Sequence, residues 1–174
     1  MSGPRALVTG GSSGIGLSFA KQLAQQGYDL VLVARRRERL EQIAQQLTRD
    51  HQIDCRVEVR DLADPDSIEA LVDALDQDGV VVEVLINNAG FGLAGAYLSQ
   101  PWQRHDQFIQ VTLLAVFELT HRLLPGMKQR GKGRIIQVSS IAGFLPGTAG
   151  HTLYGAVKAA LNLFTECLSL ECKG

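Results

Sequence analysis

A glycine-rich turn near the start of the chain reads Thr9-Gly10-Gly11-Ser12-Ser13-Gly14-Ile15-Gly16. It follows an apolar run at residues 5–9, typical of a buried strand, and leads into residues 15–26, whose apolar positions are spaced as in an amphipathic helix. Glycines allow a tight turn, and they let a phosphate approach the helix N-terminus, where free N–H groups and the helix dipole attract anions. The spacing is Gly-x-x-x-Gly-x-Gly, unlike the Gly-x-Gly-x-x-Gly of most dinucleotide folds. Such glycines also serve as packing devices in a βα turn, so other motifs must support a nucleotide site.

Strand-like and helix-like segments alternate along the rest of the chain. We expect strands at residues 5–9, 29–34, 54–59, 81–87 and 134–139, and helices at 15–26, 38–49, 65–77, 102–129 and 152–171. The almost unbroken apolar run at residues 80–86 suits a parallel sheet that is covered by helices on both faces. We therefore predict one doubly wound α/β domain over residues 1–174.

Composition agrees with a soluble enzyme, and small molecules are the expected partners. With 45% hydrophobic residues, the 174-residue chain can bury one sizeable core, and its net charge of −1 gives no electrostatic case for nucleic acid or an anionic membrane. No apolar run approaches the roughly 20 residues of a membrane span, and the first strand leaves no room for a signal peptide, so we expect a cytoplasmic protein. The three cysteines lack metal-ligand spacing, which predicts free thiols and no metal site.

A second motif predicts proton-transfer chemistry. Tyr154 and Lys158 stand four residues apart in a predicted helix, fourteen and eighteen residues after Ser140. Positions four apart share one face of a helix, so the Lys158 ammonium can lie beside the Tyr154 phenol and favour its charged form. Because an unperturbed phenol ionises only at about pH 10, a fixed positive charge is what would let it exchange a proton near neutral pH.

Together these motifs resemble the short-chain dehydrogenase/reductase family, whose members adopt a Rossmann fold. The resemblance rests on the glycine turn, on Asn87-Asn88-Ala89-Gly90, and on Ser139-Ser140 with Tyr154-Gly155-Ala156-Val157-Lys158, in that order along the chain. Residues 32–36 and 123–127 are most similar to bacterial-type members that reduce ketones with NADPH. The resemblance implies an oxidoreductase that transfers a hydride between NADP(H) and a carbonyl or secondary alcohol.

The resemblance also implies the catalytic residues. Ser140 would hydrogen-bond the substrate carbonyl, Tyr154 would exchange the proton, and Lys158 would activate Tyr154 and hold the nicotinamide ribose. Ser139 is the weaker candidate, since adjacent strand residues point to opposite sides. The family usually has an asparagine in its long fourth helix that holds a water, and Thr112 stands at that position. Thr112 is either a weaker water ligand or a helix-packing residue.

The cofactor residues that the resemblance implies are Gly10, Ser12, Ser13, Gly14, Ile15, Gly16, Arg35, Asp61, Leu62, Asn88, Ala89, Gly90, Tyr154 and Lys158. Ala34 stands where an acid would bind a ribose with a free 2′-OH, and Arg35 follows, which favours NADP(H) over NAD(H). The arginine run could instead be a solvated charge cluster at a helix start. Ser13 replaces the family's other common basic contact. Asp61 could equally be an ordinary loop aspartate.

Substrate and assembly are predicted only broadly. An apolar pocket made by Phe91, Leu93, Phe144 and Leu145 would suit a hydrophobic ketone or a long-chain acyl compound. The alternative function is a regulatory protein that senses NADPH without turnover. The helices at 102–129 and 152–171 are apolar nearly all round, so they are buried either within the domain or in a homodimer or homotetramer. Family members usually continue into further strands, so we expect this chain to be part of a longer product.

Overall fold

The computed structural model describes residues 3–93 and 95–173 and contains a five-stranded parallel sheet with the strand order β3-β2-β1-β4-β5. The strands are β1 (Arg5–Thr9), β2 (Asp29–Ala34), β3 (Cys55–Val59), β4 (Val84–Asn87) and β5 (Arg134–Gln137). The direction of winding reverses between β1 and β4. In open parallel sheets such a reversal leaves a crevice at the carboxyl ends of the strands, where ligands bind.

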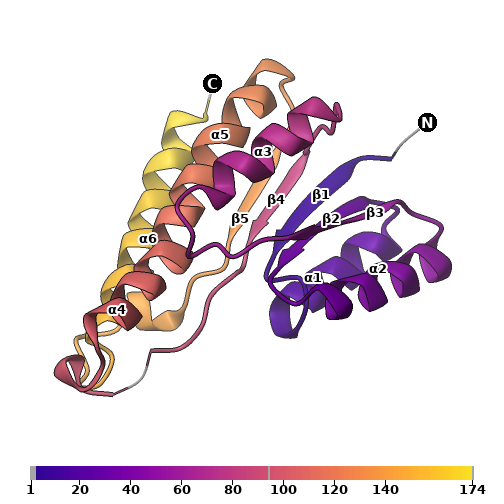
Figure 1. Cartoon of the computed structure of the whole chain (residues 1–174). Coiled ribbons are helices and arrows are strands. Elements are labelled where there is room, and N and C mark those ends of the chain that lie inside the picture. Colours follow the sequence, from indigo (N-terminus) through magenta and orange to yellow (C-terminus); the bar gives the residue numbers. More distant parts are fainter. Residues whose placement is uncertain (1–2, 94, 174) are drawn as a thin grey trace.

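Helices cover both faces of this sheet. They are α1 (Gly14–Gln25), α2 (Arg37–His51), α3 (Ser67–Gln77), α4 (Trp102–Ile109), α5 (Ala115–Gln129) and α6 (Thr152–Glu171). Figure 1 shows α1 and α2 on one side of the sheet, with α3, α5 and α6 on the other. The predicted doubly wound α/β architecture is therefore confirmed.

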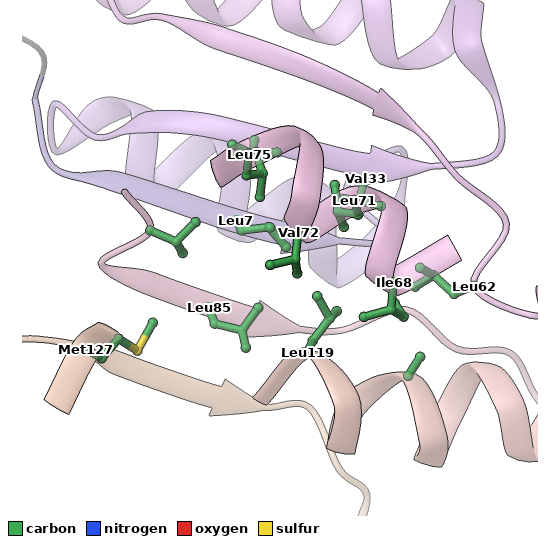
Figure 2. Close-up of a cluster of buried hydrophobic side chains, with 13 residues drawn as sticks. Leu7, Val33, Leu62, Ile68, Leu71, Val72, Leu75, Leu85, Leu119 and Met127 are labelled. Carbon is green, nitrogen blue, oxygen red and sulfur yellow. The ribbon is translucent and has the colours of Figure 1, made fainter. Parts of the chain in front are cut away.

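Alternate residues of the central strand enter two separate cores. Leu7 faces α3 and α5, and Figure 2 shows it beside Leu71 and Val72. Its neighbours Ala6 and Val8 pack instead with the α1 and α2 side chains. This alternation, with both strand faces apolar, explains why the strand sequences read as continuous apolar runs.

Several predicted boundaries were wrong, including those of β4, β5 and the helix at 102–129. β4 begins at Val84, because Val81 is half exposed and pairing with β1 starts at the Ala6–Val84 register. β5 ends at Gln137, so both Ser139 and Ser140 lie beyond the strand. The helix predicted at 102–129 is interrupted by a five-residue π-helical stretch, Gln110–Leu114.

The combined helix Trp102–Gln129 is, among the described residues, long and apolar enough to cross a membrane by length and composition alone. An 18-residue window within its 28 residues reaches a mean hydropathy of 1.2, and 33% of that window is buried. Core helices of other proteins pass the same test. Here Leu119 and Met127 pack into the core against the sheet (Figure 2), which accounts for the apolar character of one face of this helix.

Candidate active site

A cavity of about 620 Å³ lies at the carboxyl ends of the strands and brings most of the predicted residues together. The predicted residues that line it are Gly10, Ser12, Ser13, Gly14, Ile15, Arg35, Asp61, Leu62, Asn88, Ala89, Gly90, Thr112, Tyr154 and Lys158. Gly16 and Ser140 are not among the lining residues. The cavity thus connects the glycine turn at one end with the tyrosine and lysine at the other.

The glycine turn is fastened to the end of β4 by hydrogen bonds. Asn88 Nδ2 donates to the Thr9 carbonyl oxygen (2.9 Å), and Thr9 Oγ1 accepts from the backbone N–H groups of Asn88 and Ala89 at 3.0 Å each. Gly16 packs against this junction: a Cβ there would lie 2.4 Å from Asn88 Nδ2 and 2.4 Å from the Gly10 carbonyl oxygen. Gly16 therefore has a packing role. Asn88 both lines the cavity and holds the glycine turn against the end of β4.

The N-terminus of α1 can hold an anion. Gly10 and Gly14 adopt φ angles of 68° and 54°, in the left-handed region that favours glycine. A Cβ at Gly14 would meet no atom within 4 Å, so the start of the helix is open toward the cavity. The first turn of α1 contains no acidic residue, and the side chain of its N-cap, Ser13, makes no capping bond. Free N–H groups and the helix dipole are thus available to a pyrophosphate.

Tyr154 and Lys158 share one face of α6, as predicted from their spacing. The Lys158 ammonium lies 5.9 Å from the centroid of the Tyr154 ring and donates to the Val138 carbonyl oxygen at 2.9 Å. Only 8% of Lys158 is exposed, and burial lowers the pKa of its ammonium. The single carbonyl partner leaves further ammonium donors that a ribose hydroxyl could accept.

Aromatic packing fixes the orientation of the Tyr154 ring. Phe108 is fully buried, with its ring centroid 6.0 Å from that of Tyr154. Phe91 meets Phe108 edge-on at 5.5 Å and itself lines the cavity. The phenol is consequently held by a rigid aromatic cluster at the cavity wall.

The two adjacent serines have different hydrogen-bonding roles. Ser139 Oγ donates to the Lys158 carbonyl oxygen (3.2 Å), so its proton is engaged. Ser140 Oγ accepts from the Ala142 N–H (3.2 Å), which leaves its own proton without an acceptor in the described hydrogen bonds. Gly143 allows this loop to meet α6, since a Cβ there would lie 2.6 Å from the Lys158 carbonyl carbon. Sequence reasoning did not identify this contact, because nothing in the sequence indicates that the loop approaches α6.

Thr112 lies in the π-helical stretch and is 2% exposed. Its hydroxyl donates to the Phe108 carbonyl oxygen, and its methyl group faces Gly90, where a Cβ would be 3.2 Å away. The hydroxyl can therefore only accept a hydrogen bond from a water. π-Helical bulges occur frequently at functional sites.

The β2–α2 loop lies at the other end of the cavity. Arg35 is largely exposed, and its guanidinium is 3.9 Å from the Asp61 carboxylate. Arg36 turns toward the glycine turn and donates to Ser12 Oγ (3.0 Å) and Ser13 Oγ (3.2 Å). Sequence reasoning singled out Arg35 and missed Arg36, because nothing in a run of three arginines indicates which side chain faces the turn.

The predicted apolar substrate pocket was partly wrong. Phe91 lines the cavity, but Leu93 is buried against Phe108. Phe144 and Leu145 are 71% and 56% exposed and do not line the cavity. Loop side chains of this kind have no periodicity from which their direction could be predicted.

The cavity suits a dinucleotide and a proton-transfer step. It offers an open helix N-terminus for the pyrophosphate, arginines at the β2–α2 loop, and a phenol with a neighbouring ammonium at the far end. Within residues 3–93 and 95–173, no three His, Cys, Asp or Glu side chains gather as metal ligands would.

Comparison with known proteins gives consistent matches. Residues 4–174 match the family described as short chain dehydrogenase. A very-long-chain 3-oxoacyl-CoA reductase from Anas platyrhynchos is 34% identical over 175 residues, covering 98% of this chain and 55% of that protein. A short-chain dehydrogenase from Sphingobium yanoikuyae in complex with NADPH is 34% identical with a TM-score of 0.91, covering 97% of this chain and 66% of that one. A bulky-bulky ketone specific alcohol dehydrogenase from Comamonas testosteroni gives 34% identity and a TM-score of 0.91, covering 98% and 68%. The chain thus spans about half the length of the curated reductase.

Proposed function

Since the chain belongs to the short-chain dehydrogenase family, we propose that it acts as an NADP(H)-dependent oxidoreductase on a carbonyl or secondary alcohol. One observation carries this proposal: a single cavity joins an open helix N-terminus to the Tyr154–Lys158 pair. NADPH, when bound, supplies the hydride. Residues 1–174 would form one dinucleotide-binding and catalytic domain of this enzyme.

The chain's own residues would manage the proton and the substrate oxygen. Tyr154 donates its proton to the carbonyl oxygen during reduction and takes it back during oxidation. The Lys158 ammonium lies 5.9 Å from the centre of the Tyr154 ring and would hold the nicotinamide ribose with its remaining donors. Ser140 donates to the same carbonyl oxygen, which its free proton supports, while Ser139 is engaged with the backbone of α6. Thr112 accepts from a water near this site.

The cofactor proposal has two supports. Ala34 places no carboxylate at the end of β2, and Arg35 follows it at the cavity edge, which suits a 2′-phosphate. The relative from Sphingobium yanoikuyae has been solved with NADPH. Asp61 and Leu62 would bind the adenine, while Asn88, Ala89 and Gly90 line the adenosine side.

A hydrophobic ketone or long-chain acyl compound is the proposed substrate class. The apolar Phe91 at the cavity wall supports it. Similar proteins are described as a very-long-chain 3-oxoacyl-CoA reductase and as a bulky-bulky ketone specific alcohol dehydrogenase. We further propose a cytoplasmic homodimer or homotetramer that assembles through α4–α5 and α6. Leu114, Leu163 and Leu170 support that assembly, since all three are apolar and exposed on these helices.

The test is a panel of aliphatic, aromatic and 3-oxoacyl substrates, with NADPH oxidation and alcohol formation both measured. Wild type should reduce at least one hydrophobic member, and Tyr154→Phe should bind NADPH normally while losing about 10²-fold or more in rate. Binding of NADPH without any reduction across the panel would favour the alternative, a sensor without turnover. Absence of NADPH binding would contradict both.

A further inference from the structure

Arg104 places a positive charge beside the reactive end of the cavity. Its guanidinium lies over the ring of Phe91, 4.5 Å from the ring centroid, and Phe91 lines the cavity. Phe91 in turn meets Phe108 edge-on, and the Phe108 ring lies 6.0 Å from that of Tyr154. Figure 1 shows α4, which carries Arg104, beside the first turns of α6, which carries Tyr154. The guanidinium is thus connected through two aromatic rings to the phenol that would donate the proton.

The charge of Arg104 is not compensated by a carboxylate. Among the ion pairs of the described residues, none includes Arg104. The residue is exposed and lies in the first turn of α4, which contains no acidic side chain. The helix dipole adds partial positive charge at this end, so Arg104 is less favourable there than a neutral residue would be. A bound anion would be attracted by both charges.

The cavity contributes no acidic group to this end. Among its described lining residues, the one carboxylate belongs to Asp61, which lies 3.9 Å from Arg35 beside the β2–α2 loop. A ketone that enters toward Tyr154 therefore meets the apolar ring of Phe91 with a guanidinium on its face. This combination favours a ligand that has both an apolar chain and a negative charge.

We propose that Arg104 binds an anionic group of the substrate, a carboxylate or a phosphate, separated from the reacting carbonyl by an apolar chain. This inference rests on the proposed function and narrows its substrate class from hydrophobic ketones in general to negatively charged ones. An arginine can stack on an aromatic ring and still present its fork of donors to an oxyanion. Arg104 thus determines specificity, while the proton transfer stays with Tyr154.

The first test uses the full chain with NADPH and pairs of ketones that differ only in charge. Each pair is a keto acid and its methyl ester, in a series of increasing chain length. A phosphate monoester of the matching hydroxyketone shows whether phosphate or carboxylate is the preferred anion. At its best chain length, wild type should have at least tenfold higher kcat/KM for the acid than for the ester, chiefly through a lower KM.

Variants assign this preference to Arg104. The ratio of kcat/KM for acid and ester should fall at least tenfold in Arg104→Ala, and Arg104→Lys should recover part of it, since it restores the charge without the fork of donors. Arg49→Ala is the matched control. It removes the same charge from the last turn of α2, on the other face of the sheet, and should keep the wild-type ratio.

A second test measures binding without turnover, by calorimetry with octanoate and 1-octanol in the presence of NADPH. Wild type should bind octanoate more tightly than octanol, and Arg104→Ala should lose this difference. Ketone reduction with the same acid-to-ester ratio in wild type and Arg104→Ala would overturn this inference and leave the proposed function standing. The guanidinium would then only cover Phe91. Arg104-dependent binding of octanoate without reduction of any ketone would overturn the proposed function and keep the anion site. No reduction and no preference for octanoate would overturn both.

Discussion

Replacing Gly16 with alanine should disrupt the junction between the glycine turn and β4. The new Cβ would lie 2.4 Å from Asn88 Nδ2 and 2.4 Å from the Gly10 carbonyl oxygen. Both distances fall about 1 Å short of an ordinary van der Waals contact, and one of the two atoms belongs to the backbone. The turn must therefore move away from Asn88 or the helix must shift.

The size of the effect follows from two contributions. Overpacking of this kind costs about 1–3 kcal/mol. Displacing Asn88 weakens its 2.9 Å hydrogen bond to the Thr9 carbonyl, which adds about 1 kcal/mol. We expect roughly 2–4 kcal/mol in all, or a fall in Tm of roughly 5–15 °C for a chain of this size. Because Gly10 and Asn88 line the cavity, NADPH affinity should also fall about tenfold or more.

The assay is thermal unfolding by circular dichroism, together with NADPH titration by fluorescence. Gly92→Ala is the control, since Gly92 also lines the cavity but a Cβ there would meet nothing within 4 Å. That variant should match wild type in Tm and in Kd. A Gly16→Ala protein that melts within 2 °C of wild type and binds NADPH equally well would refute the reasoning.

Three further predictions concern side chains around the site and the core. Thr112→Asn should keep or raise the rate of carbonyl reduction, since asparagine adds a donor and a carbonyl; a loss of more than about tenfold would give the threonine a role of its own. Burial raises the pKa of the Cys55 thiol to about 12, so iodoacetamide at pH 8 should modify exposed Cys167 and Cys172 but not Cys55, as mass spectrometry can check. Burial lowers the pKa of Lys158 below its ordinary 10.5, so the unfolded chain binds more protons in the window just below that value. The unfolding free energy of wild type minus that of Lys158→Met should therefore rise with pH in this window, and a flat or falling difference in denaturant titrations would contradict the assignment.

The sheet was predictable because its signals are local and repeated. The continuous apolar runs and the glycine turn predict a parallel sheet with helices on both faces. The five observed strands form such a sheet. The start of β4 was not predictable, because it depends on the register with β1 and not on the apolar character of Val81.

The site was predictable where spacing along one helix determines geometry, as for Tyr154 and Lys158. The site residues on loops were harder to predict. The direction of Arg36 depends on serines that lie 24 and 23 residues away in the chain, and the exposure of Phe144 depends on a loop without periodicity. The distinction between Ser139 and Ser140 likewise required their hydrogen-bond partners.

The most direct measurement uses NADPH deuterated at C4 of the nicotinamide, with a reducible hydrophobic ketone and mass analysis of the alcohol formed. Two cofactors are compared, each deuterated at C4 on one face of the nicotinamide ring. The account predicts that wild type transfers the deuterium of one of them to the carbinol carbon of the alcohol. Tyr154→Phe, at equal cofactor occupancy, should form almost no labelled alcohol. An alcohol without deuterium from either face of the cofactor, or undiminished labelling by Tyr154→Phe, would contradict a hydride transfer that depends on this phenol.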